Sequence, residues 1–118
     1  MQMDEDVSRR MKDLLDSVRN SSAYRDFEKA REELSCYPDR KQKADQFRRE
    51  NYIVRNFPAD DTMGQRADVS KTREQLRLDP LIDRYLNTEL VLCRMLKNCA
   101  LQILNCADFD LEHMDDIL

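Results

Sequence analysis

The chain has 118 residues, 37% of them charged and 41% hydrophobic, with one glycine, three prolines and no tryptophan. Because so few glycines and prolines leave little for tight turns, the composition argues against a β-sandwich or β-barrel and favours long helices with charged outer faces. The length suits one domain, and the net charge of −4 argues against a molecule that attracts polyphosphate over its whole surface. We therefore expect a single all-α domain over residues 1–118.

The expected compartment follows from the apolar segments and the cysteines. The N-terminal residues lack the apolar stretch of a signal peptide. The most apolar segment, residues 90–107, is interrupted by Arg94 and Lys97, which indicates a buried helix rather than a membrane span. Four cysteines without the dense spacing of a secreted scaffold indicate free thiols in a reducing compartment. We expect a cytoplasmic protein without membrane insertion.

Two short helices are predicted first. The apolar positions of the first, spaced for one helical face, are Val7, Met11, Leu14, Leu15 and Val18. Asn20–Ser22 supplies side-chain oxygens that can end this helix and cap the next. The inward positions of the second are Tyr24, Phe27, Ala30 or Arg31, and Leu34. It should end near Cys36 and Tyr37, because the residue before Pro38 is pushed out of helical geometry.

A third and a fourth helix follow. Pro38 suits the first turn of the third, where its missing N–H costs no hydrogen bond. Its expected inward positions are Ala44, Phe47, Asn51 and Val54, with Ile53 and Phe57 widening the stripe. Residues 58–64, which contain the only glycine, are predicted as a loop. The fourth helix should direct Val69, Thr72 or Arg73, and Leu76 inward.

A fifth helix should run from Pro80 to about Cys106, with Asp79 as its N-cap. Two rows that repeat every seven residues form a packing seam: Ile82, Glu89, Leu96 and Ile103, and Tyr85, Leu92, Cys99 and Cys106. A third row, Leu86, Cys93 and Ala100, lies beside them, and Leu90, Leu101 and Leu104 lie off this face. We expect the long third and fifth helices to be antiparallel partners, with the short helices packed at one end and residues 108–118 as a frayed acidic tail.

Two segments resemble the YlbF/YmcA family. Its C-terminal helix begins at a proline and follows the pattern P-x-x-x-x-Y-x-x-A-E-x-x-L. To within one position, these places are held by Pro80, Tyr85, Glu89 and Leu92, with Thr88 at the usual alanine. The pattern S-x-x-Y-x-x-[YF] of the second helix is matched by Ser21, Tyr24 and Phe27. The order of the elements also agrees, so the resemblance extends over nearly the whole chain.

The resemblance implies a small helical regulator of competence, sporulation and biofilm formation. Better-studied members of the family assemble with a partner protein and influence messenger-RNA processing by a membrane-anchored endoribonuclease. Some members carry an iron–sulfur cluster on cysteines that lie largely in a C-terminal extension. We expect no such extension after the predicted fifth helix, and therefore no such cluster on this chain.

The cysteines are interpreted as structural. Cys93, Cys99 and Cys106 are expected to be small apolar side chains of the core. Cys99 and Cys106 lie about 10.5 Å apart along a helix, too far for a disulfide, which needs α-carbons within about 7 Å. Without any C-x-x-C spacing, a zinc or iron–sulfur site would need thiols from several chains. Cys36 is expected to be partly exposed, with a reactive role as the alternative.

No catalytic residue is predicted. His113, the only histidine, stands in the acidic tail without a positioned partner, and the chain contains none of the common nucleophile, phosphate-loop or zinc-protease motifs. We therefore expect no enzymatic activity, no metal and no cofactor.

Glu89 directs a carboxylate at the apolar seam, which is costly unless the charge is paired. Candidate partners are cations of the third helix, such as Arg48, or the hydroxyls of Tyr24 or Tyr85. We interpret it as a structural ion pair or hydrogen bond that fixes helix register; a role in partner binding is the alternative.

Two surfaces are predicted. The expected partner or oligomer interface comprises Phe47, Val54, Ile82, Tyr85, Leu86, Glu89, Leu92, Leu96, Cys99 and Ile103. The candidate basic docking face comprises Arg40, Lys41, Arg48, Arg49 and Arg55, and Lys43 belongs to the same basic set. Because acidic residues are interspersed among them, this face is interpreted first as solvated and second as a docking surface for an acidic partner.

The prediction for function is a regulatory or adaptor protein. The apolar fifth helix needs more cover than so short a chain supplies, so we expect a homodimer or homotetramer that also binds other regulatory proteins. Direct RNA binding through the third helix, and a redox or iron–sulfur sensor, are the alternatives.

Overall fold

The computed structural model describes residues 4–56 and 62–107, and these form five α-helices. Their bounds are Glu5–Arg19 for α1, Ser22–Ser35 for α2, Pro38–Asn56 for α3, Thr62–Leu76 for α4 and Pro80–Asn105 for α5. The described residues contain no strand, so the predicted all-α class is confirmed. Phe57 and the predicted tail over residues 108–118 lie outside the described residues.

Polar side chains set the helix boundaries as predicted. Asn20 is the C-cap of α1, and the Ser21 hydroxyl accepts a hydrogen bond from the backbone N–H of Tyr24 (3.2 Å) as the N-cap of α2. The Asp79 carboxylate accepts from the N–H of Leu81 (3.0 Å) at the start of α5, which follows at Pro80. Such caps satisfy amide groups that the first helical turn leaves without a partner.

The loop between α3 and α4 is shorter than predicted. Because α4 begins at Thr62, the predicted loop over residues 58–64 is wrong for Thr62–Gly64, which form the first turn of the helix. One glycine in a helix costs only about 1 kcal/mol relative to alanine, so the good helix formers that follow outweigh it.

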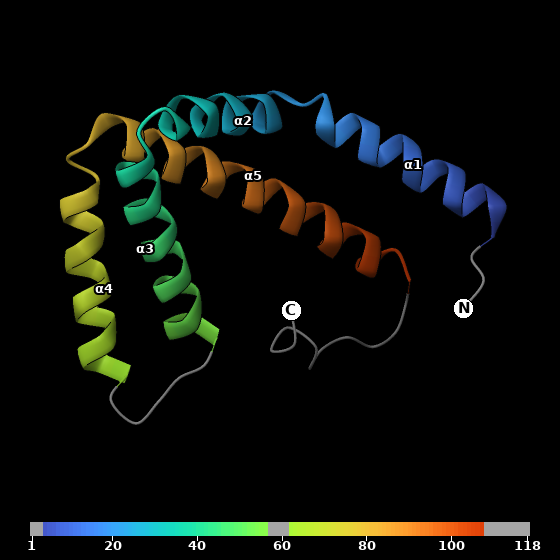
Figure 1. Cartoon of the computed structure of the whole chain (residues 1–118). Helices are drawn as coiled ribbons and strands as arrows, with labels where there is room; N and C mark the ends of the chain where they lie inside the picture. The colour runs from blue at the N-terminus through green and yellow to red at the C-terminus, as the bar shows by residue number, and fades with distance from the viewer. Residues whose placement is uncertain (1–3, 57–61, 108–118) are drawn as a thin grey trace.

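The helices form two pairs. In Figure 1, α2 lies along the N-terminal half of α5, while α3 and α4 lie side by side and project away from that pair. The core lies where the pairs meet and includes Ala30, Leu34, Ala44, Phe47, Val54, Val69, Ile82, Tyr85 and Leu86, with Phe27, Leu76 and Leu81 packed against it. Ile53 was expected to widen the inward stripe of α3, but it is exposed, because it lies one helical step from the buried Val54.

Two helical segments extend beyond this core. None of the residues of α1 is buried, although its apolar side chains form a distinct stripe. The last buried residue of α5 is Leu92, so the helix continues for more than three turns without burying a side chain. The Cα radius of gyration is 17.8 Å, whereas a compact domain of this length has about 13–14 Å. The chain therefore leaves two apolar arms uncovered, α1 and residues 93–105 of α5.

Candidate functional site

Tyr85 is the centre of the contact between α2, α3 and α5. Its side chain is 1% exposed, and its ring stacks on Phe27 of α2 with centroids 5.6 Å apart. Its hydroxyl accepts a hydrogen bond from Nη1 of Arg48 (2.9 Å) and donates one to a carboxylate oxygen of Asp45 (3.1 Å). The phenol therefore places an apolar ring in the core and a satisfied polar group at its edge.

Arg48 joins α3 to α5. Its guanidinium forms ion pairs with Asp45 on its own helix and with Glu89 on α5, and it lies over the Tyr85 ring at 5.4 Å from the centroid. Lys41 pairs with Asp45 from the other side. We refer to Lys41, Asp45, Arg48, Tyr85 and Glu89 as the Arg48 cluster.

The pKa values in the Arg48 cluster indicate mutual stabilisation. Burial alone would raise the pKa of Asp45, but hydrogen bonds from Lys41, Arg48 and Tyr85 hold it below its ordinary value. The hydrogen bond to Asp45 raises the pKa of Lys41, against the effect of burial. Burial raises the pKa of Tyr85, although the nearby Arg48 charge opposes the shift. Over the neutral pH range, Asp45 and Lys41 therefore remain charged and the phenol of Tyr85 remains neutral.

The structure confirms Arg48 as the partner of Glu89, one of the candidates that the sequence suggested. The residues that carry the family resemblance also meet here, because Phe27 stacks on Tyr85 and Ser21 caps the helix that carries Phe27. Glu89 therefore joins α5 to α3 through an ion pair, which is the contact that the structural interpretation expected.

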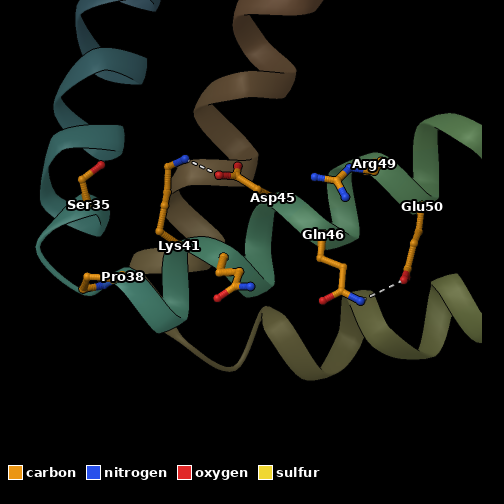
Figure 2. A pocket seen from close by; sticks show the side chains of 8 residues that line it. Ser35, Pro38, Lys41, Asp45, Gln46, Arg49 and Glu50 are labelled. Carbon is orange, nitrogen blue, oxygen red and sulfur yellow. Dashed lines mark hydrogen bonds and ion pairs between the residues drawn. The ribbon is translucent and has the colours of Figure 1, made fainter.

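A hollow of about 670 Å³ lies between the end of α2 and the exposed face of α3, and Figure 2 shows the side chains that line it. Lys41 points toward Asp45 and Gln46 toward Glu50, and both pairs lie within α3. Because its polar side chains mostly bind one another along one helix, this hollow is a solvated face rather than a built site.

The predicted interface residues separate into two groups. Six of them lie within the chain's own fold: Phe47, Val54, Ile82, Tyr85, Leu86 and Leu92. Leu96 and Ile103 are 43% and 47% exposed, and Cys99 is half-buried. Only these last three, all on the distal arm of α5, present apolar surface that a partner could cover.

None of the three cysteines predicted for the core lies in it, and Cys99 is only half-buried. Cys93 and Cys106 are exposed, because α2 covers only the N-terminal half of α5, and Cys36 is exposed as expected. Burial, with a smaller effect of Glu89, raises the pKa of the Cys93 thiol, which disfavours the reactive thiolate. Within the described residues, no three His, Cys, Asp or Glu side chains come together as a metal site.

The predicted basic face is largely engaged in ion pairs. Arg40 pairs with Asp79 (2.6 Å), and Lys41 and Arg48 belong to the cluster described above. Arg49 and Arg55 are exposed and line a groove between α3, α4 and α5, together with Arg73, Arg77 and Arg94. These last three arginines were missed in the sequence; only the spacing of Arg73 and Arg77, four residues apart, hinted at a shared face.

The geometry of the described residues offers surfaces on which another molecule could bind. The charged groups of the Arg48 cluster are bound to one another, and the uncovered surfaces are the two apolar arms and the arginine-lined groove. Within the described residues, no helix is long and apolar enough to cross a bilayer.

Comparison with known proteins places the chain in a family. Searches of curated proteins and of solved structures return no significant match. The family model described as control of competence regulator ComK, YlbF/YmcA, matches residues 7–105, which include all five helices almost completely. The chain belongs to the YlbF/YmcA family of competence-control regulators.

Proposed function

We propose that this chain is a non-enzymatic regulatory adaptor, which acts by binding other protein chains, a second copy of itself among them. The observation that carries the proposal is the exposure of the two apolar arms. Val7 and Leu15 on α1, like Leu96 and Ile103 on α5, are about half exposed in the isolated chain. Apolar side chains that are exposed along one face of a helix offer a surface for another protein chain.

Self-association would cover the exposed apolar side chains of both arms in one assembly. A helix whose apolar stripe its own chain leaves uncovered gains stability by packing against another helix. Two copies related by a two-fold axis would bring together four such helices, which is the arrangement of a four-helix bundle. A homodimer, or a homotetramer built from it, is therefore the expected assembly.

Membership in the family supports a regulatory role for this assembly. The family is described by its control of a competence regulator, which is a developmental function. We propose that the chain joins other regulatory proteins in such a pathway, within the range of competence, sporulation, biofilm formation and messenger-RNA processing that the family resemblance implies.

The molar mass in solution tests the proposal. Light scattering coupled to size exclusion at tens of micromolar should give a multiple of 14.1 kDa. The double substitution Leu96→Glu/Ile103→Glu should lower the mass to that of one chain without loss of helical circular dichroism, because neither side chain is buried in the monomer. Leu78→Glu/Tyr37→Glu is the matched control, since it changes two exposed apolar residues outside both arms. A wild-type mass of 14.1 kDa would contradict self-association.

A further inference from the structure

The groove between α3, α4 and α5 concentrates positive charge. Its volume is about 960 Å³. Its charged lining comprises six arginines and two carboxylates: Arg48, Arg49, Arg55, Arg73, Arg77 and Arg94, with Asp45 and Glu89. The whole chain has a net charge of −4, so this surface is opposite in sign to the molecule that carries it.

Most of this positive charge is not neutralised within the groove. Arg48 holds both lining carboxylates, Asp45 and Glu89. Arg77 pairs with Asp83 at 3.2 Å. Among the residues that the structure describes, the other four arginines form no ion pair: Arg49, Arg55, Arg73 and Arg94. Arg73 donates a hydrogen bond to the side-chain oxygen of Asn51 (3.3 Å). Because no carboxylate of the described residues pairs with these four arginines, their charges are available to an anionic partner.

The groove also has an apolar component. Phe47 and Leu86 form a nearly buried floor, with Arg73 lying over the Phe47 ring at 5.7 Å from the centroid. Leu90, 40% exposed, and the exposed Cys93 lie on the α5 side. An occupant that matches this surface carries carboxylates for the arginines and apolar side chains for the floor and the α5 side.

We propose that the groove binds an acidic, amphipathic segment of a partner protein. The proposal rests on the proposed adaptor function and assigns it a second surface, which adjoins the distal arm of α5 at Cys93 and Arg94. Charge complementarity selects the partner, because four unpaired arginines disfavour a basic or neutral segment. Arginine also suits carboxylates geometrically, since its planar fork can donate two parallel hydrogen bonds.

The lining favours a peptide over single-stranded RNA. RNA-binding grooves combine cations with aromatic side chains on which bases stack. Here Tyr52 is the exposed aromatic residue of the lining, whereas Phe47 is buried beneath Arg73. The remaining uncharged side chains are aliphatic, thiol or amide groups, which provide packing and hydrogen bonds but no stacking surface.

A labelled peptide tests the groove directly. The probe is DFDLEHMDDIL, the sequence of residues 108–118, which combines five carboxylates with five large apolar side chains. Its neutral analogue replaces every Asp and Glu by Asn and Gln. Fluorescence anisotropy with the full chain should show binding of the acidic probe, at least tenfold weaker binding of the analogue, and weakening between 50 and 300 mM salt.

Charge-reversal variants locate the site. Arg49→Glu/Arg94→Glu should weaken binding at least tenfold, because it reverses two exposed, unpaired groove charges. Arg25→Glu/Lys71→Glu, an equal change in charge at exposed positions outside the groove, should alter it less than twofold. The proposal is overturned if the acidic probe does not bind, or if both variants lose the same amount of affinity for it. Preferential binding of an 11-nucleotide RNA that requires Arg49 and Arg94 also overturns it.

A full-chain variant with the five acidic residues of 108–118 changed to amides distinguishes a partner from the chain's own segment. If the wild type and this variant bind the acidic probe with equal affinity, the groove is available to a partner protein. If only the variant binds the probe, residues 108–118 of the chain itself occupy the groove, and the proposal is overturned. The mass measurement decides the adaptor function separately. If the chain is an oligomer but does not bind the probe, the adaptor function stands and only the proposal for the groove is rejected.

Discussion

Arg48 serves three groups with one guanidinium: the carboxylates of Asp45 and Glu89 and the hydroxyl of Tyr85. Its side chain is 37% exposed, so water weakens each ion pair relative to a fully buried one. Its structural value lies in connecting α3 to α5, which otherwise contact one another only sparsely.

Replacement of Arg48 should therefore destabilise the fold. Arg48→Met keeps the length and apolar stem but leaves Glu89, whose side chain is only 23% exposed, without its ion-pair partner. We expect the free energy of unfolding in urea to fall by about 1–2 kcal/mol. Arg49→Met, at the exposed neighbouring position, is the control and should change it by less than about 0.5 kcal/mol. Equal effects of both substitutions would contradict the role of the cluster.

The pKa shifts predict how stability depends on pH. The pKa of Asp45 is lowered, so its contribution is present above pH 3.8 and is lost as the pH falls through its value in the folded chain. The pKa of Lys41 is raised, so its contribution is present below pH 10.5 and is lost above it. The raised pKa of Tyr85 means that folding favours the neutral phenol, so deprotonation above pH 10 opposes the fold.

Urea unfolding between pH 3 and pH 11 should therefore show a plateau that falls at both ends. Tyr85→Phe should reduce the loss above pH 10, whereas Tyr37→Phe, an exposed tyrosine outside the Arg48 cluster, should leave it unchanged. A loss of stability that begins near neutral pH would contradict this assignment.

The two halves of α5 differ in their surroundings although the helix is continuous. Its N-terminal half contributes Ile82, Tyr85 and Leu86 to the core, and Arg84 pairs with Glu33 of α2 at 2.7 Å. Its C-terminal half presents Leu96 and Ile103 to the surface of the isolated chain. The continuous heptad pattern therefore forms a core inside the chain and, under the proposed adaptor function, an interface outside it.

The start of α5 depends on Asp79. Its carboxylate caps the helix and also pairs with Arg40 of α3. Asp79→Ala should lower the free energy of unfolding by about 1–2 kcal/mol, because both the cap and the ion pair are lost. Asp79→Asn retains the cap and should recover more than half of the lost free energy of unfolding. Arg40→Ala alone should lower the free energy of unfolding by less than Asp79→Ala does. Equal stability of the Ala and Asn variants would show that the cap contributes nothing.

The molecule as a whole is extended, with principal dimensions of 46 × 38 × 21 Å. The fold buries its apolar residues around α2 and the N-terminal half of α5, and the remaining apolar stripes project from that centre. Assembly would complete the packing that one chain leaves unfinished, which links the shape of the protein to its proposed adaptor role.

Thiol alkylation should report this assembly. Cys99 lies on the distal arm of α5 and Cys106 is the C-cap at its end, whereas the exposed Cys36 lies at the end of α2, outside both arms. As the protein concentration rises through the dimerisation range, iodoacetamide should modify Cys99 and Cys106 several-fold more slowly, while the rate at Cys36 stays constant. In Leu96→Glu/Ile103→Glu the protection should disappear. Protection that does not depend on concentration would contradict assembly through this arm.

The sequence by itself determined the helices, because their signals are local. The apolar spacing, the capping residues Ser21 and Asp79, and the prolines at positions 38 and 80 act within a few residues of one another. It also indicated a charge pair for Glu89, since a carboxylate in an apolar row requires a partner.

Only the tertiary structure decided which apolar positions are buried. Ile82 and Leu96 occupy the same heptad row, yet one lies in the core and the other is exposed, because α2 covers only the first half of α5. The groove likewise brings Arg49, Arg73 and Arg94 together from three helices, and no local pattern specifies a contact between segments so far apart in the chain. Helix periodicity defines a face, but the fold determines what covers it.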